Sequence, residues 1–160
     1  MTVDLLYLGL PGNRTPQTSK LLKATKIPFF GHERMLNTQI FISIARMHHI
    51  SNPSKFRRLK RHAIHANVSG LVKTGKPGVL VFEGSKESIS TFLENVRVLR
   101  YLQFQHVDTQ PLAIDMQGGL AQSKVGLREV VDMRALVDAL DQIGLKPWFR
   151  TQMSMDKGPP

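Results

Sequence analysis

Alternation of apolar residues first appears after residue 38. Ile40, Ile42 and Ile44 alternate with other side chains, and β-branched residues at a period of two predict a β-strand. The intervening positions, including Phe41 and Ala45, are also fairly apolar. We therefore expect a central strand that ends before Ser51-Asn52-Pro53.

Two later segments have helical spacing. In the first, residues 54 to 66, apolar side chains recur at three- and four-residue intervals and basic side chains fill the other side. Pro53 and Ser54 suit its start, and Asn67 can end it. The second begins after Ser85, a suitable N-cap. The expected buried positions are Phe56, Leu59, Ala63 and Ile64 in the first helix, and Ile89, Phe92, Leu93, Val96 and Leu99 in the second.

Three more strands complete the pattern. Residues 68 to 73 and 79 to 83 flank Thr74-Gly75-Lys76-Pro77-Gly78, which is rich in turn-forming residues and predicts a hairpin. A last strand is expected at residues 102 to 107. The order strand, helix, strand, strand, helix, strand is that of the split βαβ arrangement. We therefore predict an α+β fold: a ferredoxin-like sandwich of a four-stranded antiparallel sheet with two helices, leaving one sheet face open.

The segment after Pro111 predicts one further helix, at residues 129 to 143, with Asp132 as a cap and Gly144 after its end. This helix could pack on the open sheet face, and Trp148 and Phe149 follow it. The expected organisation is a poorly ordered lead-in (1–37), a ferredoxin-like domain (38–112), a loop and C-terminal helix packing on the domain (113–150) and a disordered tail (151–160).

Positive charge is concentrated in one part of the chain. The formal net charge is +10. Residues 34 to 82 contain nine lysine or arginine residues and no aspartate or glutamate. A local acid-free stretch of this kind is typical of a surface that binds a polyanion.

Several classes of protein are disfavoured by composition. The chain has no cysteine, which excludes disulfides, thiolate metal sites and cysteine nucleophiles. It also has no apolar run long enough for a transmembrane helix, so no membrane association is expected. We expect a nuclear or cytoplasmic protein. A mitochondrial location, suggested by the basic residues of the first 32 positions, is the weaker alternative.

The basic face of the first helix is the main candidate site. Four cationic side chains within barely more than one turn can contact successive phosphates without reading sequence. The hairpin lysines extend this patch, and the histidines after the first strand could hydrogen-bond to phosphate or stack on a base. The expected nucleic-acid-binding residues are His48, His49, Lys55, Arg57, Arg58, Lys60, Arg61, Lys73 and Lys76.

Other chemistry is weakly supported by the sequence. His48 and His49 are expected at the end of the first strand, where adjacent side chains point to opposite faces and cannot easily share a metal ion, so no metal site is expected. Phe41 and Phe82 could stack on bases from an open sheet face, but we expect them in the core. No paired carboxylates, nucleophile elbow or phosphate-binding glycine loop is present. We therefore predict a protein without catalytic residues or a cofactor.

Three short motifs carry a family resemblance: His48-His49-Ile50, Gly75-Lys76-Pro77-Gly78 and Glu83-Gly84 before the second helix. Together they resemble the C-terminal domain shared by splicing factors of the Prp-three type and RWD-domain-containing proteins of the second subgroup. The resemblance covers residues 38 to 110 and extends weakly to Phe149. It implies a ferredoxin-like domain that, in the splicing factors, binds small nuclear RNA. The chain has no room for an RWD domain and lacks the long N-terminal region of the splicing factors.

The resulting interpretation is an RNA-binding accessory domain, linked to ribonucleoprotein assembly or RNA processing. The first alternative is a protein-interaction module of the RWD-protein type, with Trp148 and Phe149 binding the partner. The second is an enzyme acting on a phosphorylated small molecule.

Overall fold

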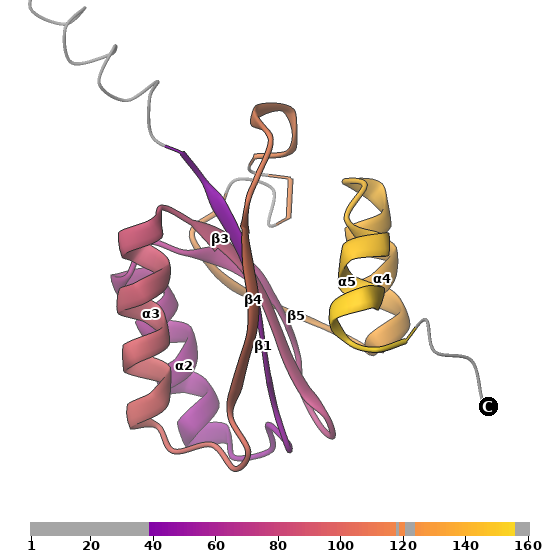
Figure 1. Ribbon diagram of the computed structural model, residues 1–160. Coiled ribbons are helices and arrows are strands. Elements are labelled where there is room, and N and C mark those ends of the chain that lie inside the picture. The colour runs from indigo at the N-terminus through magenta and orange to yellow at the C-terminus, as the bar shows by residue number, and fades with distance from the viewer. Residues whose placement is uncertain (1–38, 118, 121–123, 156–160) are drawn as a thin grey trace, which may run out of the picture. The chain divides into compact units, whose positions relative to one another are not determined.

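The computed structural model describes residues 39–117, 119–120 and 124–155, which belong to one compact unit, Gln39–Pro160. The chain folds into a five-stranded mixed sheet with two helices on each face (Figure 1). The elements, in chain order, are β1 (Phe41–Met47), α2 (Pro53–His65), β2 (Ser69–Lys73), β3 (Gly78–Gly84), α3 (Lys86–Val98), β4 (Gln105–Pro111), the 3-10 turn η2 (Ile114–Met116), β5 (Gly126–Val130), α4 (Met133–Gln142) and α5 (Lys146–Gln152).

The first four strands have the predicted ferredoxin-like arrangement. The sheet order is β4-β1-β3-β2-β5, and β1 to β4 pair antiparallel with their neighbours. The predicted four-stranded sheet was incomplete, because β5 pairs parallel with β2, with Ser69 opposite Gly126. Sequence spacing had assigned Glu129 and Val130 to a helix, but α4 begins only at Met133.

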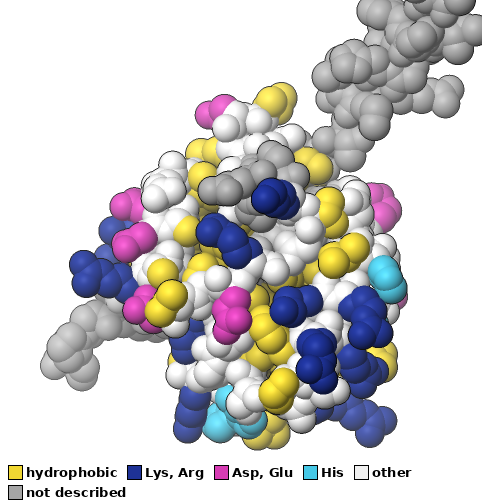
Figure 2. Space-filling view, turned by 180° about the vertical axis from the view of Figure 1, so that it is seen from behind, with side chains coloured by type: hydrophobic (Ala, Val, Ile, Leu, Met, Phe, Trp, Pro, Cys, Tyr) yellow, Lys and Arg dark blue, Asp and Glu magenta, His cyan; other side chains and the backbone are white. Residues whose placement is uncertain are grey.

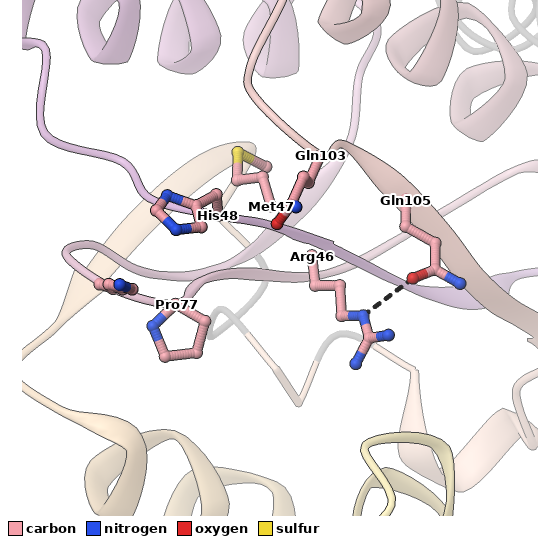
Figure 3. A pocket seen from close by; sticks show the side chains of 7 residues that line it. Arg46, Met47, His48, Pro77, Gln103 and Gln105 are labelled. Carbon is pink, nitrogen blue, oxygen red and sulfur yellow. Dashed lines mark hydrogen bonds between the residues drawn. The ribbon is translucent and has the colours of Figure 1, made fainter.

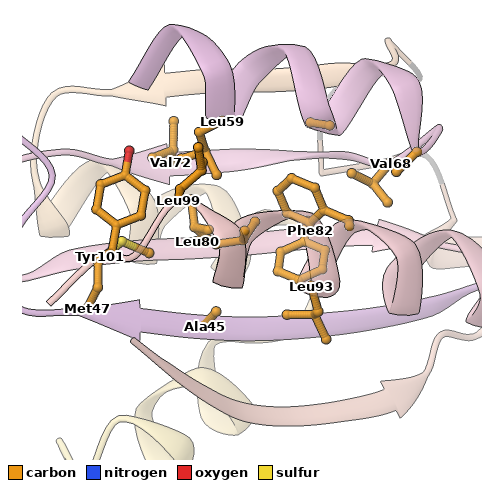
Figure 4. Close-up of a cluster of buried hydrophobic side chains, with 14 of the residues drawn as sticks. Ala45, Met47, Leu59, Val68, Val72, Leu80, Phe82, Leu93, Leu99 and Tyr101 are labelled. Carbon is orange, nitrogen blue, oxygen red and sulfur yellow. The ribbon is translucent and has the colours of Figure 1, made fainter. Parts of the chain in front are cut away.

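A first core lies between the sheet and helices α2 and α3 (Figure 4). All five apolar positions predicted for α3 are buried, and Ser85 caps this helix by accepting from the Ser88 amide at 3.1 Å. Phe82 is fully buried and stacks edge-on against Phe92, as expected for a core residue. In α2, Leu59 and Ala63 are buried, but Ile64 is 57% exposed, so its predicted place in the core was wrong.

A second core covers the opposite sheet face, which the sequence left open or covered by one helix. Ile42 and Ile44 of β1 pack there with Leu136 and Leu140 of α4 and with Phe149 of α5. Asp132 caps α4 by accepting from the Ala135 amide at 2.8 Å, as predicted. Both faces of the sheet are therefore covered by helices.

All four predicted regions lie wholly or partly outside the described residues: 38–112 lacks only residue 38, and 113–150 lacks only residues 118 and 121–123. The lead-in, 1–37, is entirely outside. Residues 151–160, expected to be a disordered tail, begin within α5, and the chain is described as far as Met155.

Candidate anion-binding surfaces

Helix α2 orders the basic stretch of the sequence. Asn52 caps the helix, with its side chain accepting from the Lys55 amide at 3.0 Å, and Pro53 occupies the first turn. Because Leu59 and Ala63 face the sheet, Arg57, Arg58 and Arg61 are left exposed. Figure 2 shows lysine and arginine side chains gathered on this side of the molecule.

The basic side chains do not all line one hollow. Three hollows each contain some of them, whereas Arg57, Arg58 and Arg61 line none of these three. We call these hollows the α2–β5 groove, the β1-end pocket and the α2 N-terminal pocket.

The α2–β5 groove combines apolar and cationic side chains. Its volume is about 350 Å³. Ile64, which is 57% exposed, and Val125, which is 49% exposed, contribute apolar surface. Gly126 leaves room beside Ile64, because a Cβ there would lie 3.2 Å from the Ile64 Cγ1 atom. The full lining is Lys60, Ile64, Lys124, Val125, Gly126, Leu127 and Arg128.

The β1-end pocket lies where β1 ends beside the β2–β3 turn (Figure 3). It has a volume of about 430 Å³. The Arg46 Nε atom donates to the Gln105 Oε1 atom at 2.9 Å, so the guanidinium is held against β4. The pocket is lined by Arg46, Met47, His48, Lys76, Pro77, Gln103 and Gln105.

The α2 N-terminal pocket is smaller, about 280 Å³, and is the most polar of the three. The Lys55 ammonium donates to the Arg100 carbonyl at 3.2 Å and lies 5.4 Å from the centre of the Tyr101 ring. This bond ties the first turn of α2 to the segment between α3 and β4. The lining residues are His49, Ser51, Asn52, Lys55, Arg100, Tyr101 and Leu102.

A histidine pair links the two pockets at this end of the sheet. His48 lines the β1-end pocket and His49 lines the α2 N-terminal pocket. Their Nδ1 atoms are 2.8 Å apart, so one ring donates to the other. The expectation that the two side chains point to opposite faces was wrong, because β1 ends at Met47 and the histidines follow it outside the strand.

Burial alters the protonation of two groups near α2. The pKa of His62 is lowered, first by burial and then by the neighbouring cations Arg58, His65 and Arg61. Burial raises the pKa of Tyr101 to about 12. Both shifts favour the neutral form, because a charged group loses solvation when it is buried.

Other predicted site residues have structural contacts. The Lys73 ammonium donates to the Pro77 carbonyl at 2.9 Å and so closes the β2–β3 turn. Phe149 is fully buried in the second core. The Trp148 indole donates to Asp108 Oδ2 at 2.8 Å, which fastens α5 to β4. These contacts place Phe149 in the core rather than on a free interaction surface.

Sequence reasoning missed several residues that line the hollows. Arg100 and Tyr101 follow the last turn of α3. Lys124 precedes strand β5, which was not predicted, and Arg128 belongs to it. A weak signal was present at β5, where Leu127 and Val130 enclose two charged residues. Nothing in the sequence indicated that β5 pairs with β2.

Comparisons with known proteins do not identify a family. No protein-family model matches the chain, and no curated protein matches it. Among solved structures it is similar to BlrB, a BLUF protein in its dark state, with a TM-score of 0.46 and 15% identity over 75% of this chain and 98% of that one. It is also similar to the BLUF domain of BlrP1, with a TM-score of 0.46 and 16% identity over 66% and 74% of the two chains.

The resemblance to the Prp-three C-terminal domain was wrong, because no family model and no curated protein matches the chain. The RNA-binding and ribonucleoprotein interpretation that depended on it was therefore wrong. The motif residues have local structural roles instead. Gly75 has a φ of +79°, and a Cβ on Gly78 would lie 2.5 Å from the Ile50 Cγ1 atom. Turn geometry and close packing of this kind recur in unrelated proteins.

Among the described residues, no helix is long and apolar enough to cross a membrane.

Proposed function

We propose that this domain is a non-catalytic interaction module that binds an acidic polypeptide segment in the α2–β5 groove. The observation that carries the proposal is the composition of the groove. Three apolar side chains lie among three cationic ones, Lys60, Lys124 and Arg128, and no carboxylate lines it. A segment that combines aspartate or glutamate with apolar residues matches both components.

The apolar component favours a polypeptide partner. Ile64 lies in the last turn of α2, on a helix whose other exposed positions are mostly basic. Burying exposed apolar surface is favourable by about 25 cal/mol per Å². A purely ionic ligand would leave Ile64 and Val125 in water, whereas an apolar side chain between acidic ones would cover them.

The edge of the sheet supplies a second feature that suits a polypeptide. β5 is the last strand of the sheet, and no described strand pairs with its outer side. The Gly126 amide donates to the Val68 carbonyl at 2.8 Å, towards β2. Because successive peptide groups of a strand alternate in direction, the amides of Leu127 and Glu129 point away from β2. An extended segment can pair with these groups by strand addition.

The covered sheet argues against base stacking on this domain. Single-stranded nucleic acids are commonly bound by aromatic side chains on an open sheet face. Here Phe82 is buried beneath α2 and α3, and Phe41 packs against the same core. The opposite face lies beneath α4 and α5 (Figure 1).

Ser43 and His106 form a serine–histidine contact like that of a catalytic pair, but a substrate has no access to it. The Ser43 Oγ atom lies 3.0 Å from His106 Nε2 and 2.8 Å from Thr109 Oγ1. Ser43 is fully buried and lines none of the three hollows, so a substrate cannot reach its hydroxyl. The network instead joins β1 to β4 beside the register shift at Ile44 and Ala45.

Fluorescence anisotropy tests the proposal. The probe is a short labelled peptide of alternating valine and glutamate, compared with a single-stranded RNA of equal charge. We expect the peptide to bind more tightly than the RNA, with an affinity that falls as salt is added. Lys60→Glu and Arg128→Glu should each weaken peptide binding by about fivefold or more, and Ile64→Ser by a similar factor.

The control is Arg97→Glu, which makes the same charge change at an exposed position of α3. If Arg97→Glu weakens binding as much as Lys60→Glu, the peptide senses only overall charge. Tighter binding of the RNA, or an unchanged affinity in Ile64→Ser, would also contradict the proposal.

A further inference from the structure

We infer that the segment bound in the α2–β5 groove also carries a lysine or arginine, which pairs with Glu129 in an adjoining hollow. The inference rests on the proposed function, because this hollow extends the same groove. We call it the Glu129 pocket. It has a volume of about 180 Å³ and lies where the start of α2 meets Thr74, just after β2, and Glu129 of β5.

The Glu129 pocket lies along the same boundary between α2 and β5 as the groove. Lys60 and Ile64 of α2 line the groove, whereas Phe56, one helical turn earlier, lines the pocket. On β5 the groove extends to Arg128, and the pocket contains the next residue, Glu129. The helix and the strand therefore run in opposite directions past both hollows, and one extended ligand can contact both.

The distance between the two hollows is short for an extended chain. Phe56 and Ile64 are separated by a stretch of helix that rises by about 12 Å. Gly126 and Glu129 are separated by a stretch of strand that rises by about 10 Å. An extended segment covers this distance in about three or four residues. The basic residue should therefore lie about that far from the acidic residues that occupy the groove.

The charge of the Glu129 pocket is opposite to that of the groove. The groove contains three cationic side chains and no carboxylate, whereas the pocket contains one carboxylate and no lysine, arginine or histidine. Within the part of the chain that the structure describes, Glu129 forms no ion pair. The chain has 22 lysine and arginine residues against 12 aspartate and glutamate residues, so cations to pair with it are plentiful. A lysine or arginine of the bound segment would supply the missing partner.

The Glu129 carboxylate is held in place without capping α2. The Thr74 hydroxyl donates to its Oε1 atom at 2.6 Å. At the start of α2, the Lys55 amide is already bonded to the Asn52 side chain, and Pro53 has no amide hydrogen. No described residue donates to the Oε2 atom of Glu129, which is therefore able to accept from a ligand.

The remaining lining suits the stem of a long basic side chain. Pro53 and the half-buried Phe56 contribute apolar surface beside the carboxylate. Lysine and arginine bury their methylene stems against such surface while the charged end reaches a polar group. The Lys60 ammonium already lies 4.7 Å from the centre of the Phe56 ring, so the incoming cation should pair with Glu129 rather than stack on that ring. A metal ion would meet a single carboxylate, fewer charged ligands than such an ion needs.

This arrangement gives the groove a preferred orientation of its ligand. A segment of alternating valine and glutamate has nearly the same side-chain pattern in both directions. A cation at one end of the segment would pair with Glu129. At the other end it would lie near Lys124, which precedes β5 and repels it. Glu129 is therefore a specificity-determining residue, because it favours one orientation and disfavours the other.

Titration of the ¹⁵N-labelled protein with three heptapeptides, followed by NMR, tests this pocket. Each peptide is acetylated and amidated and has a core of alternating valine and glutamate. The first has glutamine at both ends, and the other two have a single lysine at the N-terminal or at the C-terminal end. The two lysine peptides have the same composition and net charge. We expect their affinities to differ by about fivefold or more, because lysine is attracted at one end and repelled at the other. The tighter one should also shift the amides of Thr74 and Glu129.

One variant and a matched control assign the difference to Glu129. Glu129→Gln removes the charge but keeps an acceptor for Thr74, so the two lysine peptides should then bind within about twofold of each other. The same variant should bind the glutamine peptide at least as tightly as the parent does, because the groove loses no cation. The control, Glu94→Gln, removes the same charge at an exposed position of α3 and should keep the full difference.

The possible results separate this inference from the proposed function. Equal affinities of the two lysine peptides, with the glutamine peptide still bound in the groove, would overturn the role of Glu129 alone. A difference that persists in Glu129→Gln, or that Glu94→Gln also removes, would overturn it as well. If none of the three peptides binds, peptide binding in the groove is wrong, and the role of Glu129 fails with it.

Discussion

Replacing Tyr101 by phenylalanine tests how the buried hydroxyl affects folding. The substitution removes one oxygen atom and keeps the ring, which packs in the first core (Figure 4). The hydroxyl lacks a partner among the described residues. An unsatisfied buried polar group costs about 1–3 kcal/mol. We therefore expect the variant to be more stable than the parent by about 1 kcal/mol near pH 8.

The same substitution should change how stability depends on pH. Burial raises the pKa of Tyr101 to about 12 in the folded protein, whereas an unfolded chain has a tyrosine pKa of about 10. Between these values the unfolded chain loses a proton that the folded protein keeps. The stabilisation is complete below the unfolded pKa and is lost as pH rises through the folded one. The full loss is about 2.7 kcal/mol, from about 1.4 kcal/mol for each unit of the shift.

Urea denaturation at a series of pH values from 8 to about 11.5 measures both effects. Lysine ionisation affects the parent and the variant alike, so the difference between them isolates Tyr101. That difference should be constant below about pH 9.5 and then widen in favour of phenylalanine. Tyr7→Phe makes the same change at the chain's other tyrosine and serves as the control.

Two outcomes would refute the reasoning. A Tyr101→Phe variant that is less stable than the parent near pH 8 would mean that the hydroxyl has a partner in the folded protein. A stability difference that does not change with pH would mean that the hydroxyl ionises as easily in the folded chain as in the unfolded one.

Three further substitutions test other parts of the structure. Gly78→Ala should destabilise the fold by about 1–3 kcal/mol, because the new Cβ would lie 2.5 Å from Ile50 Cγ1; an unchanged urea midpoint would contradict this packing. His62→Gln should reduce the loss of stability below pH 6.5. The pKa of His62 is lowered in the folded protein, so as the pH drops the unfolded chain binds the proton first, and stability falls until the pH has passed the pKa of the folded protein. Parallel pH profiles of the variant and the parent would exclude the effect. Trp148→Phe should cost about 1.5–3 kcal/mol, measured by circular dichroism, by removing the 2.8 Å bond to Asp108; a neutral result would show that α5 does not depend on that bond.

The sequence predicted best those elements in which buried apolar residues recur at a regular spacing. In α3 the buried residues recur at three- and four-residue intervals, because only one side of the helix faces the sheet, so they can be recognised without information from the rest of the chain. Strand β1 was also clear, since both of its faces are covered by helices. Ile64 shows the limit of this reasoning. Its spacing fits the stripe of α2, yet it lies beside Gly126 of the edge strand β5 and is 57% exposed.

Strand β5 was missed because its pairing is a tertiary event. Leu127 packs against the first core and Val130 belongs to the second, so the strand places its few apolar residues on both sides of the sheet. A short segment with charged residues between them shows no period of two. Its place is set by β2, which lies more than fifty residues earlier in the chain. The groove beside it could not be predicted without that pairing.

The α2 N-terminal pocket was hidden for a related reason. Charge density along the chain directed attention to Arg57, Arg58 and Arg61, which the structure leaves on an exposed helix face. An exposed cation is surrounded by water, so its interaction with an anion is weakened by the high dielectric and by salt. Lys55 and Arg100 are 45 residues apart in sequence, yet the Lys55 ammonium donates to the Arg100 carbonyl beside this pocket. That contact arises only from the packing of α2 against the end of α3, so the charge pattern along the chain could not indicate it.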